Sequence, residues 1–415
     1  MNYTVISDKI TPLQLKHAAR CICDAQSIAI ITHQNPDGDA MGSSLGMRFF
    51  LQALGKTNVT NIVPTSFPDF LAWLPGVNEA IQYEQQPEAA VQALREADLV
   101  ICTDLAEAGR VAALSPILAE RFSAYAQSSE GSDSSEGSEN SECSENSENS
   151  ECSPKSSLLI IDHHLSSVCS GHPEQIAFPD SASASELVFR LAWQFARSSR
   201  AVVEPLSSHS RAIVGSRPDF SDILTPEFAT CIYTGMMTDT GNFSYNSCEP
   251  EMYNIVATLL TTGIDKDAIY DRVFNAYSAD RMRLIGYCLY HKMKLFPEYH
   301  AALITLNRKE MYRFNAKSGD MEGIVNMPLQ IKDVYYSVFM REDKIPPHQQ
   351  EEAKGAKVKA KISFRSQGNR PVNILAREVF RGGGHMNASG GEFFGSVDEA
   401  AAKFIETMSR YLQKD

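Results

Sequence analysis

Short apolar runs alternate with helical patterns along the first quarter of the chain. The run SIAIIT (27–32) precedes the helical pattern AMGSSLGMRFFLQALG, and the runs NVTNIVP and DLVICTD (98–104) follow with another helical stretch between them. Strands that alternate with helices in this way indicate a parallel sheet. The pattern resumes at SLLIID (157–162) and continues with a predicted helix over 185–196. We therefore predict an α/β fold, with an N-terminal domain built on a parallel sheet that carries helices on both faces.

The chain is long enough for more than one domain. Its 415 residues correspond to two or three domains of ordinary size. We predict a first domain over 1–250, a helical linker over 251–295, and a smaller α/β domain over 296–415 in which the strands AALITL and KVKAKISFRS alternate with helices. A metal site is expected in the cleft between the two domains.

Two polar stretches interrupt the first domain. Residues 129–152 form eight triplets of serine, an acidic residue and a small residue, with eight negative charges and no positive ones. Because this tract has few apolar side chains to offset its ordering entropy, we predict a disordered acidic insertion at about 127–156. A second loop insertion is predicted at about 198–222. An acidic segment near the crevice would repel longer polyanions.

The acidic tract also dominates the charge of the chain. The formal net charge is −13, and subtracting the eight charges of the tract leaves −5 for the remainder. A mildly acidic body fits a long nucleic-acid groove poorly, because binding of duplex relies on Lys and Arg. It remains compatible with small anionic substrates if metal ions supply the local positive potential.

The cysteines and the N-terminus favour the cytoplasm. The nine cysteines are scattered and include no C-x-x-C pair, which indicates reduced thiols. The sequence has no run of about 18 apolar residues and no pattern typical of a signal peptide. We therefore expect a cytoplasmic protein that does not associate with a membrane.

A histidine and two aspartates follow the first apolar run directly, in the segment HQNPDGDA (33–40). This places His33, Asp37 and Asp39 at the carboxyl end of a strand, where open α/β sheets bind ligands. Pro36 and the glycine that follows Asp37 favour a tight turn, so that both carboxylates project from one loop. Two metal ions about 3.5 to 4 Å apart could use all three side chains.

Three further segments add acidic residues and histidines at comparable places. Asp104 ends DLVICTD, Asp162-His163-His164 ends SLLIID, and Asp239 follows a helical pattern over 226–238. A carboxylate at the end of a central strand is costly to bury without a cation. Each segment alone is compatible with a turn or a helix cap, but together they favour one centre. The predicted metal ligands are His33, Asp37, Asp39, Asp104, His163 and Asp239.

These ligands are nitrogen and hard oxygen donors. Such donors suit Mn²⁺ or Mg²⁺ better than an ion that prefers thiolates, and the two imidazoles favour Mn²⁺. We expect two Mn²⁺ ions, with Mg²⁺ as the alternative.

The second domain contains a glycine cluster, RGGGHMNASGG (381–391). Backbone amides exposed by glycine can bind phosphate oxygens, and Arg365 at the end of KVKAKISFRS can bind a phosphate in bidentate fashion. The alternative is a turn that only joins two secondary elements. The predicted substrate-binding residues are Arg365, Gly382, Gly383, Gly384 and His385.

One serine motif is rejected. The segment GSSLG (42–46) matches the nucleophile elbow G-x-S-x-G. That elbow requires a strand directly before the serine, whereas the preceding strand ends near Thr32 and Ser44 falls in a helical pattern. The match does not predict a serine hydrolase.

The motifs resemble, in order, those of the DHH phosphoesterase superfamily. HQNPDGDAMGSSLG is similar to the first motif, CTD with Asp104 to the second, IDHH to the third and GMMTDTGNF to the fourth. SFRS and GGGHMNASGG resemble the DHH-associated C-terminal domain. Within the superfamily the chain most resembles bifunctional oligoribonucleases that also remove the 3′-phosphate of adenosine 3′,5′-bisphosphate. The resemblance implies two Mn²⁺ ions on the six residues already chosen.

We therefore expect a phosphoesterase that uses a water activated by two metal ions. Its expected substrates are short single-stranded RNA, the 3′-phosphate of adenosine 3′,5′-bisphosphate, or both. Asp104 is the expected bridge between the ions. Asp162 is expected to orient His163 or to lie behind it, and His164 to contact the scissile phosphate or assist the leaving oxygen. The alternatives are a cyclic-dinucleotide phosphodiesterase and, in another class, a catalytically silent nucleotide sensor. A homodimer is an open alternative to a monomer.

Overall fold

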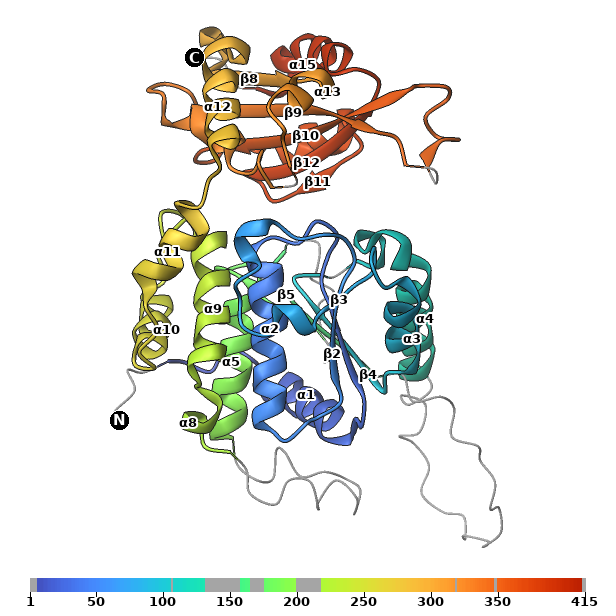
Figure 1. Cartoon of the computed structure of the whole chain (residues 1–415), viewed down its shortest axis with the longest axis vertical. Coiled ribbons are helices and arrows are strands. Elements are labelled where there is room, and N and C mark those ends of the chain that lie inside the picture. Colours follow the sequence, from blue (N-terminus) through green and yellow to red (C-terminus); the bar gives the residue numbers. More distant parts are fainter. Residues whose placement is uncertain are drawn as a thin grey trace, which may run out of the picture. The chain divides into compact units, whose positions relative to one another are not determined.

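The computed structural model describes residues 6–105, 107–130, 157–164, 175–198, 218–317, 319–346 and 349–412. The chain forms two compact units, Met1–Val273 and Phe274–Asp415 (Figure 1). The division falls inside 251–295, the segment predicted as a helical linker. Helices α10 (Pro250–Leu260) and most of α11 (Lys266–Phe274) belong to the first unit, and α12 (Ala279–Tyr287) to the second.

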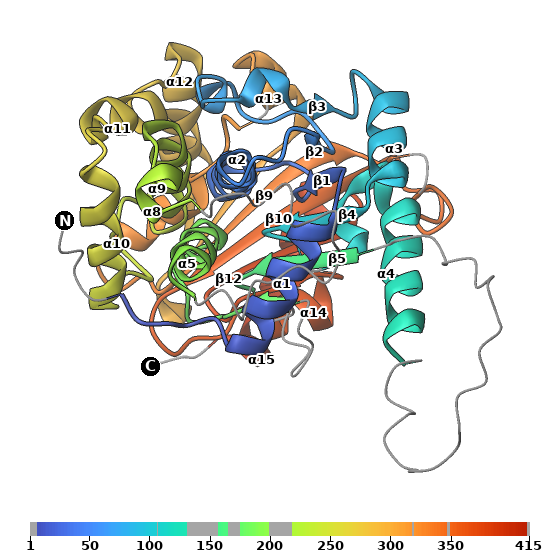
Figure 2. The ribbon, with the colours of Figure 1, turned by 90° about the horizontal axis from the view of Figure 1, so that it is seen from below.

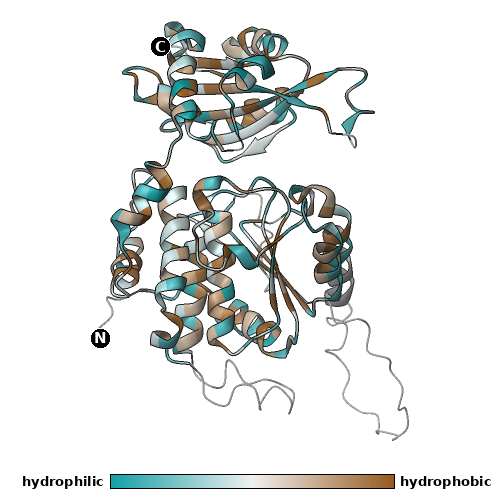
Figure 3. Cartoon of the chain, in the orientation of Figure 1, coloured by the Kyte–Doolittle hydropathy of each residue, from teal (hydrophilic) through white to brown (hydrophobic). Residues whose placement is uncertain are grey.

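The first unit contains a six-stranded sheet in the order β3-β2-β1-β4-β5-β6. Every neighbouring pair is parallel, which confirms the predicted parallel sheet. All residues of β1 and β4 are buried, as expected where helices cover both faces, and the strands appear hydrophobic in Figure 3. The strands are β1 (Ile28–Ile31), β2 (Val59–Val63), β3 (Ile81–Gln82), β4 (Leu99–Thr103), β5 (Ser157–Asp162) and β6 (Gln175–Ala177).

Helices lie on both sides of this sheet, with α2, α5 and α9 on one side and α3 and α4 on the other (Figures 1 and 2). Apolar side chains of β1, β4 and β5 form one core with those of α3 and α4. The helices of the unit, besides α10 and α11, are α1 (Pro12–Asp24), α2 (Gly38–Ala53), α3 (Pro87–Glu96), α4 (Ser115–Glu130), α5 (Ala184–Arg197), α8 (Phe220–Ile223) and α9 (Pro226–Asp239). Among the described residues, none of the helices has the length and apolar character needed to span a membrane.

Glycines allow α2 to pack closely against α9. Gly38, Gly42 and Gly46 are four residues apart and therefore share one face of α2. A Cβ atom at Gly42 would lie 2.9 Å from the Cα atom of Gly235 in α9, which is closer than real side chains approach. The G-x-S-x-G pattern is thus explained by helix packing. Ser44 is buried inside α2, which agrees with the rejection of a serine nucleophile.

The two predicted insertions differ from expectation at their ends. Helix α4 continues to Glu130, so the start of the first insertion is helical rather than disordered. The second insertion, predicted as a loop to about 222, ends in α8. There the amide of Asp219 donates to the carboxylate of Asp222 and the side chains of Phe220 and Ile223 are buried, which stabilises a short helix. Residues 131–156 and 199–217, the main parts of both insertions, lie outside the described residues.

The second unit contains another six-stranded sheet, in the order β11-β12-β10-β9-β8-β7. The β8–β9 pair is parallel and the other pairs are antiparallel. Helices α14 (Asn373–Val379) and α15 (Val397–Tyr411) contribute to the apolar core on one face. The strands are β7 (Lys294–Phe296), β8 (Ala301–Leu306), β9 (Tyr336–Lys344), β10 (Val358–Ser366), β11 (Gly383–Gly384) and β12 (Ala388–Phe394). A short helix, α13 (Arg308–Arg313), follows β8.

Candidate metal centre

Six side chains meet at one edge of the parallel sheet. Strands β1, β4 and β5 are neighbours and run in the same direction, so their carboxyl ends lie together. Helix α2 begins and α9 ends at the same place. The six are His33 after β1, Asp37 and Asp39 at the start of α2, Asp104 after β4, His163 after β5 and Asp239 at the end of α9. These are the residues that the sequence predicts as metal ligands.

The first triad consists of His33, Asp37 and Asp104. One ligand atom from each lies within 4.8 Å of the other two. His33 Nδ1 is 2.9 Å from the carbonyl oxygen of Gln34, which accepts the Nδ1 proton. His33 Nε2 is 3.1 Å from Asp104 Oδ2, so that these two atoms must share either a proton or a cation. Asp37 caps α2 through Oδ1, which accepts from the amide of Asp39 at 3.0 Å.

The second triad consists of Asp39, His163 and Asp239. His163 Nε2 lies 3.4 Å from Asp239 Oδ2 and 3.9 Å from Asp39 Oδ2. The same nitrogen is 3.8 Å from Asp104 Oδ1. Asp104 therefore directs one carboxylate oxygen to each triad, as a ligand shared between two metal ions would.

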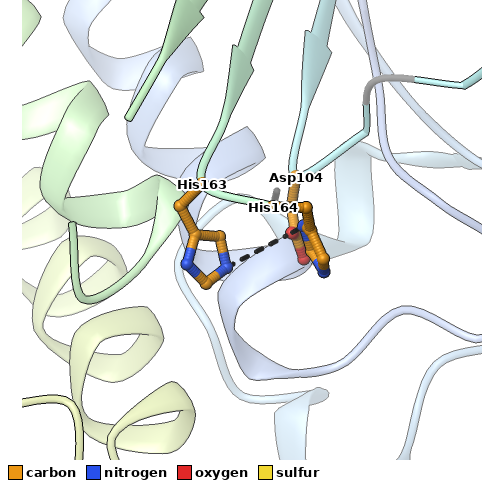
Figure 4. A group of neighbouring side chains, drawn as sticks. All are labelled: Asp104, His163 and His164. Atoms are coloured by element: carbon orange, nitrogen blue, oxygen red, sulfur yellow. Dashed lines mark ion pairs between the residues drawn. The ribbon is translucent and has the colours of Figure 1, made fainter. Parts of the chain in front are cut away.

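The backbone at Asp104 holds that carboxylate in place. Asp104 has a φ of 55°, the left-handed conformation that aspartate tolerates better than most residues. Its amide donates to the carbonyl of Ile161 at 2.9 Å, which ties the turn to β5. Figure 4 shows the ring of His163 joined by a dashed line to the Asp104 carboxylate, with the His164 ring close to the same carboxylate. The position after β4 is thus fixed by the sheet itself.

Asp39 is held by a helix that lies far away in the sequence. The amides of Ala184 and Ser185, at the N-terminus of α5, donate to Asp39 Oδ2 and Oδ1 at 2.7 and 2.9 Å. Free amides and the positive end of the helix dipole stabilise a carboxylate there. Sequence reasoning missed these two residues. The only signal is the helix start SASASE, which does not show which side chain the amides would bind.

Asp162 organises the histidine pair. Its Oδ1 accepts hydrogen bonds from the amide of His163 at 2.8 Å and from Nδ1 of His164 at 2.7 Å. The sequence predicts that Asp162 orients His163. The structure shows Asp162 bound to the backbone of His163 and to the ring of His164. The reason is local geometry, because Asp162 Oδ1 lies at the end of β5 facing the next two residues of the chain.

Electrostatic coupling in this cluster is strong. Burial lowers the pKa of His33, but the hydrogen bond and charge of Asp104 outweigh it and raise the pKa to about 9. Burial likewise lowers the pKa of His163, and the charges of Asp239, Asp104 and Asp39 raise it to about 9. Burial and the charge of Asp104 raise the pKa of Asp39 to about 6. The crowded carboxylates therefore favour the protonated form of both imidazoles.

The cluster fits a pair of divalent cations. Asp104 Oδ1 is fully buried and accepts no hydrogen bond from any described residue. Burial raises the pKa of Asp104, but the hydrogen bond from His33 and its charge outweigh that and hold the pKa well below its usual range. Burial holds the pKa of Asp239 well above its usual range. All donors in the two triads are imidazole nitrogens or carboxylate oxygens, which suits hard or borderline divalent ions.

The predicted substrate-binding residues lie in the second unit. The Arg365 side chain on β10 donates through Nη1 to the carbonyl of Phe364 at 2.9 Å. The glycine cluster is a hairpin at the edge of the sheet rather than a loop, because Gly383 and Gly384 pair with β12. The amide of Gly382 donates to the carbonyl of Ala376 at 2.9 Å, so it is already used within the fold. His385 begins the turn that follows β11.

Known proteins with similar sequences and structures identify the family. Residues 27–122 match the DHH family N-terminal domain, and residues 300–414 match the DHHA1 domain. The chain is 37% identical to an exopolyphosphatase-related protein of Bacteroides fragilis, and their structures superpose with a TM-score of 0.74 over 98% of each chain. The chain belongs to the DHH family. This DHH protein has the two-domain architecture that the motifs predict.

Two further relatives are more distant. The bifunctional oligoribonuclease and PAP phosphatase NrnA of Thermus thermophilus is 25% identical over 392 residues, which cover 93% of this chain and 90% of that protein. RecJ of Thermus thermophilus, solved in complex with Mn²⁺, is 13% identical to this chain, and the TM-score is 0.47. The match covers 98% of this chain and 56% of the RecJ chain. As a DHH family member, the chain is a hydrolase that acts on phosphoric ester bonds, which confirms the predicted enzyme class.

Proposed function

We propose that this DHH protein is a cytoplasmic, Mn²⁺-dependent phosphoesterase that hydrolyses short oligoribonucleotides and the 3′-phosphate of adenosine 3′,5′-bisphosphate. The observation that carries the proposal is the pair of triads joined by Asp104. The name of the NrnA relative, which covers nearly the whole chain, supports this choice of substrates. The cysteines of the described residues form no disulfide with one another, which supports a reducing compartment.

Each triad would hold one ion. His33 and Asp37 would bind the first, Asp39, His163 and Asp239 the second, and Asp104 both. When bound, two such ions supply charge stabilisation at the phosphoryl oxygens and a water of lowered pKa. Mg²⁺ is the alternative to Mn²⁺, because the carboxylate donors accept either ion.

His164 is the side chain suited to the scissile phosphate. Asp162 holds its Nδ1 at 2.7 Å, which fixes the ring and leaves Nε2 on the other side. The side chain is 22% exposed, compared with 9% for His163, so it is the more accessible ring of the pair. In this position Nε2 can donate a hydrogen bond to a phosphoryl oxygen or to the leaving oxygen.

The second unit would bind the nucleotide. Arg365 supplies a guanidinium for a phosphate, and His385 lies in the turn at the end of the glycine hairpin. Gly383 and Gly390 are paired across the hairpin, and a Cβ atom at Gly383 would have no neighbour within 4 Å. A substrate can therefore approach the backbone there directly. We propose that Gly383 and Gly390 form this floor, that Gly384 binds substrate through its backbone next to it, and that Gly382 supports it through its bond to Ala376.

The test is hydrolysis by the full chain with added Mn²⁺. Product release is compared for adenosine 3′,5′-bisphosphate, a diribonucleotide, a cyclic dinucleotide and pyrophosphate. The proposal expects turnover of the first two and its loss in Asp104→Asn, a variant of nearly the same volume that lacks the charge shared by both triads. Turnover of the cyclic dinucleotide alone would replace the proposed substrates. Equal turnover by wild type and Asp104→Asn would contradict the proposed centre.

A further inference from the structure

The sheet of the second unit carries a pair of cations in addition to Arg365. Along β10, the even-numbered side chains from 360 to 364 belong to the apolar core with α14 and α15. Lys361 and Arg365 alternate with them and therefore lie on the opposite face. Lys361 is directly paired in register with Arg341 of β9, so that two positive side chains face the same side of neighbouring strands.

This cation pair is only partly neutralised within the described part of the fold. On its other side Lys361 pairs in register with Glu392 of β12, but the Glu392 carboxylate accepts from Lys359 Nζ at 2.7 Å. In the part of the chain that the structure describes, no acidic oxygen lies within 4.0 Å of the Lys361 amine. Among these described residues, the only ion-pair partner of Arg341 is Asp343, at 4.0 Å. Like charges opposite each other destabilise a sheet, so the pair reduces stability unless an anion binds.

Burial strengthens this argument. Burial and the charge of Arg341 lower the pKa of Lys361, with Lys359 acting in the same direction. Asp343 and Glu392 raise it, yet the net shift is downward. A nearby phosphate would reverse that shift, because it would supply the missing opposite charge.

The face between Lys361 and Arg365 is lined by small residues. Ser363 lies between them on β10 and pairs with Gly390, which in turn pairs with Gly383. A Cβ atom at Gly390 would meet only a backbone carbonyl at 3.8 Å, an ordinary contact, and at Gly383 it would meet nothing within 4 Å. Gly383 and Gly390 therefore form a glycine floor that no described residue covers closely, and a polynucleotide backbone could lie on it.

The spacing separates two phosphate positions. Lys361 and Arg365 are four residues apart on one strand, which corresponds to about 13 Å. With both side chains standing away from the sheet, that spacing is wider than one phosphate group and suits two phosphates of the same strand.

We propose that Lys361 and Arg341 form a subsite for an additional backbone phosphate of an oligoribonucleotide, on the glycine-floored face that also bears Arg365. This inference rests on the proposed function and extends its oligoribonucleotide substrates to strands longer than a dinucleotide. Arg341 offers a planar fork of donors and Lys361 a compact charge, a combination that suits a phosphodiester. Substrates without an additional phosphate would not use the subsite.

The test is the length dependence of Lys361→Gln, measured with the full chain and Mn²⁺. Wild type and variant are compared on adenosine 3′,5′-bisphosphate, a diribonucleotide and a pentaribonucleotide. The KM for the pentaribonucleotide should rise by about tenfold, the effect of one charge-assisted hydrogen bond, while its kcat and the KM for the bisphosphate stay unchanged. For the pentaribonucleotide, the slope of log KM against the logarithm of the salt concentration should also become shallower, by about 0.7 for each phosphate contact that is lost.

A matched control and a second variant complete the design. Lys403→Gln removes the same charge from α15, where Lys403 pairs with Glu406, and should leave every KM unchanged. Arg341→Gln repeats the test from the neighbouring strand. A KM that rises equally for all three substrates, or for none, would overturn the subsite. Wild type that cleaves no oligoribonucleotide would instead overturn the proposed function, so the two failures are distinguishable.

Discussion

Gly235→Ala should weaken metal binding although Gly235 is not a ligand. A Cβ atom at this position of α9 would lie 1.9 Å from Ser185 Oγ and 2.9 Å from Asp39 Oδ1. Rotation of the Ser185 side chain can relieve the first contact, but Ser185 Cβ would still lie at 2.8 Å. Real Cβ contacts are essentially never shorter than 3.0 Å, so the start of α5 must also move by a few tenths of an ångström. That shift acts directly on the bonds of 2.7 and 2.9 Å that hold Asp39.

The size of the effect follows from two separate contributions. Overpacking of a close helix contact typically destabilises a protein by about 1 to 3 kcal/mol. Loss of the partners that orient a metal ligand typically reduces metal affinity by about 10- to 100-fold. Gly46→Ala is the matched control, because its Cβ would meet the flexible end of Ile232 at 2.5 Å, seven residues along α2 from Asp39. It should reduce stability without changing metal affinity.

The assay combines urea unfolding of the metal-free protein with calorimetric titration of Mn²⁺. Both variants should unfold at lower urea, and only Gly235→Ala should bind Mn²⁺ more weakly. Ser185→Ala added to Gly235→Ala removes the atom at 1.9 Å and should restore part of the affinity. Wild-type affinity in Gly235→Ala, or an equal loss of affinity in Gly46→Ala, would refute the claim that α5 positions Asp39.

Four further outcomes are expected. Arg365→Ala should raise KM for adenosine 3′,5′-bisphosphate by about tenfold or more with little change in kcat, as steady-state kinetics would show, because a charged phosphate contact is lost. Asp162→Ala should lower the free energy of unfolding by about 1 to 3 kcal/mol in urea titrations, because the buried amide of His163 loses its acceptor. Chelation of Mn²⁺ should lower the melting temperature in calorimetry, by the equivalent of about 2.7 kcal/mol if the ion was present at 100 times its Kd. Ser44→Ala should retain full turnover, since Ser44 is buried in α2 and its hydroxyl donates to the carbonyl of Met41.

The parallel sheet and the convergence of the candidate ligands were predictable because their signals are local. Each apolar run with a terminal Asp or His places its polar residue at the same sheet edge, so His33, Asp104 and His163 converge without any knowledge of side-chain packing. The position of Asp239 was predictable as a motif, but its approach to His163 depends on the close packing of α2 and α9.

Contacts between distant segments were not predictable in this way. The bonds from Ala184 and Ser185 to Asp39 span about 145 residues, and nothing local marks them. The glycine cluster illustrates a different limit. Its composition predicts exposed amides, yet Gly383 and Gly384 pair with β12 as strand residues. Which glycines line an open face follows from the strand register, which composition does not give.

The most direct test of the two-metal centre is the number of bound Mn²⁺ ions measured together with turnover. Elemental analysis after equilibration should find two ions per wild-type chain, and fewer than two in Asp239→Ala, which removes a ligand of only one triad. The same variant should lose hydrolysis of adenosine 3′,5′-bisphosphate. One ion per wild-type chain, or unchanged turnover in Asp239→Ala, would contradict the account.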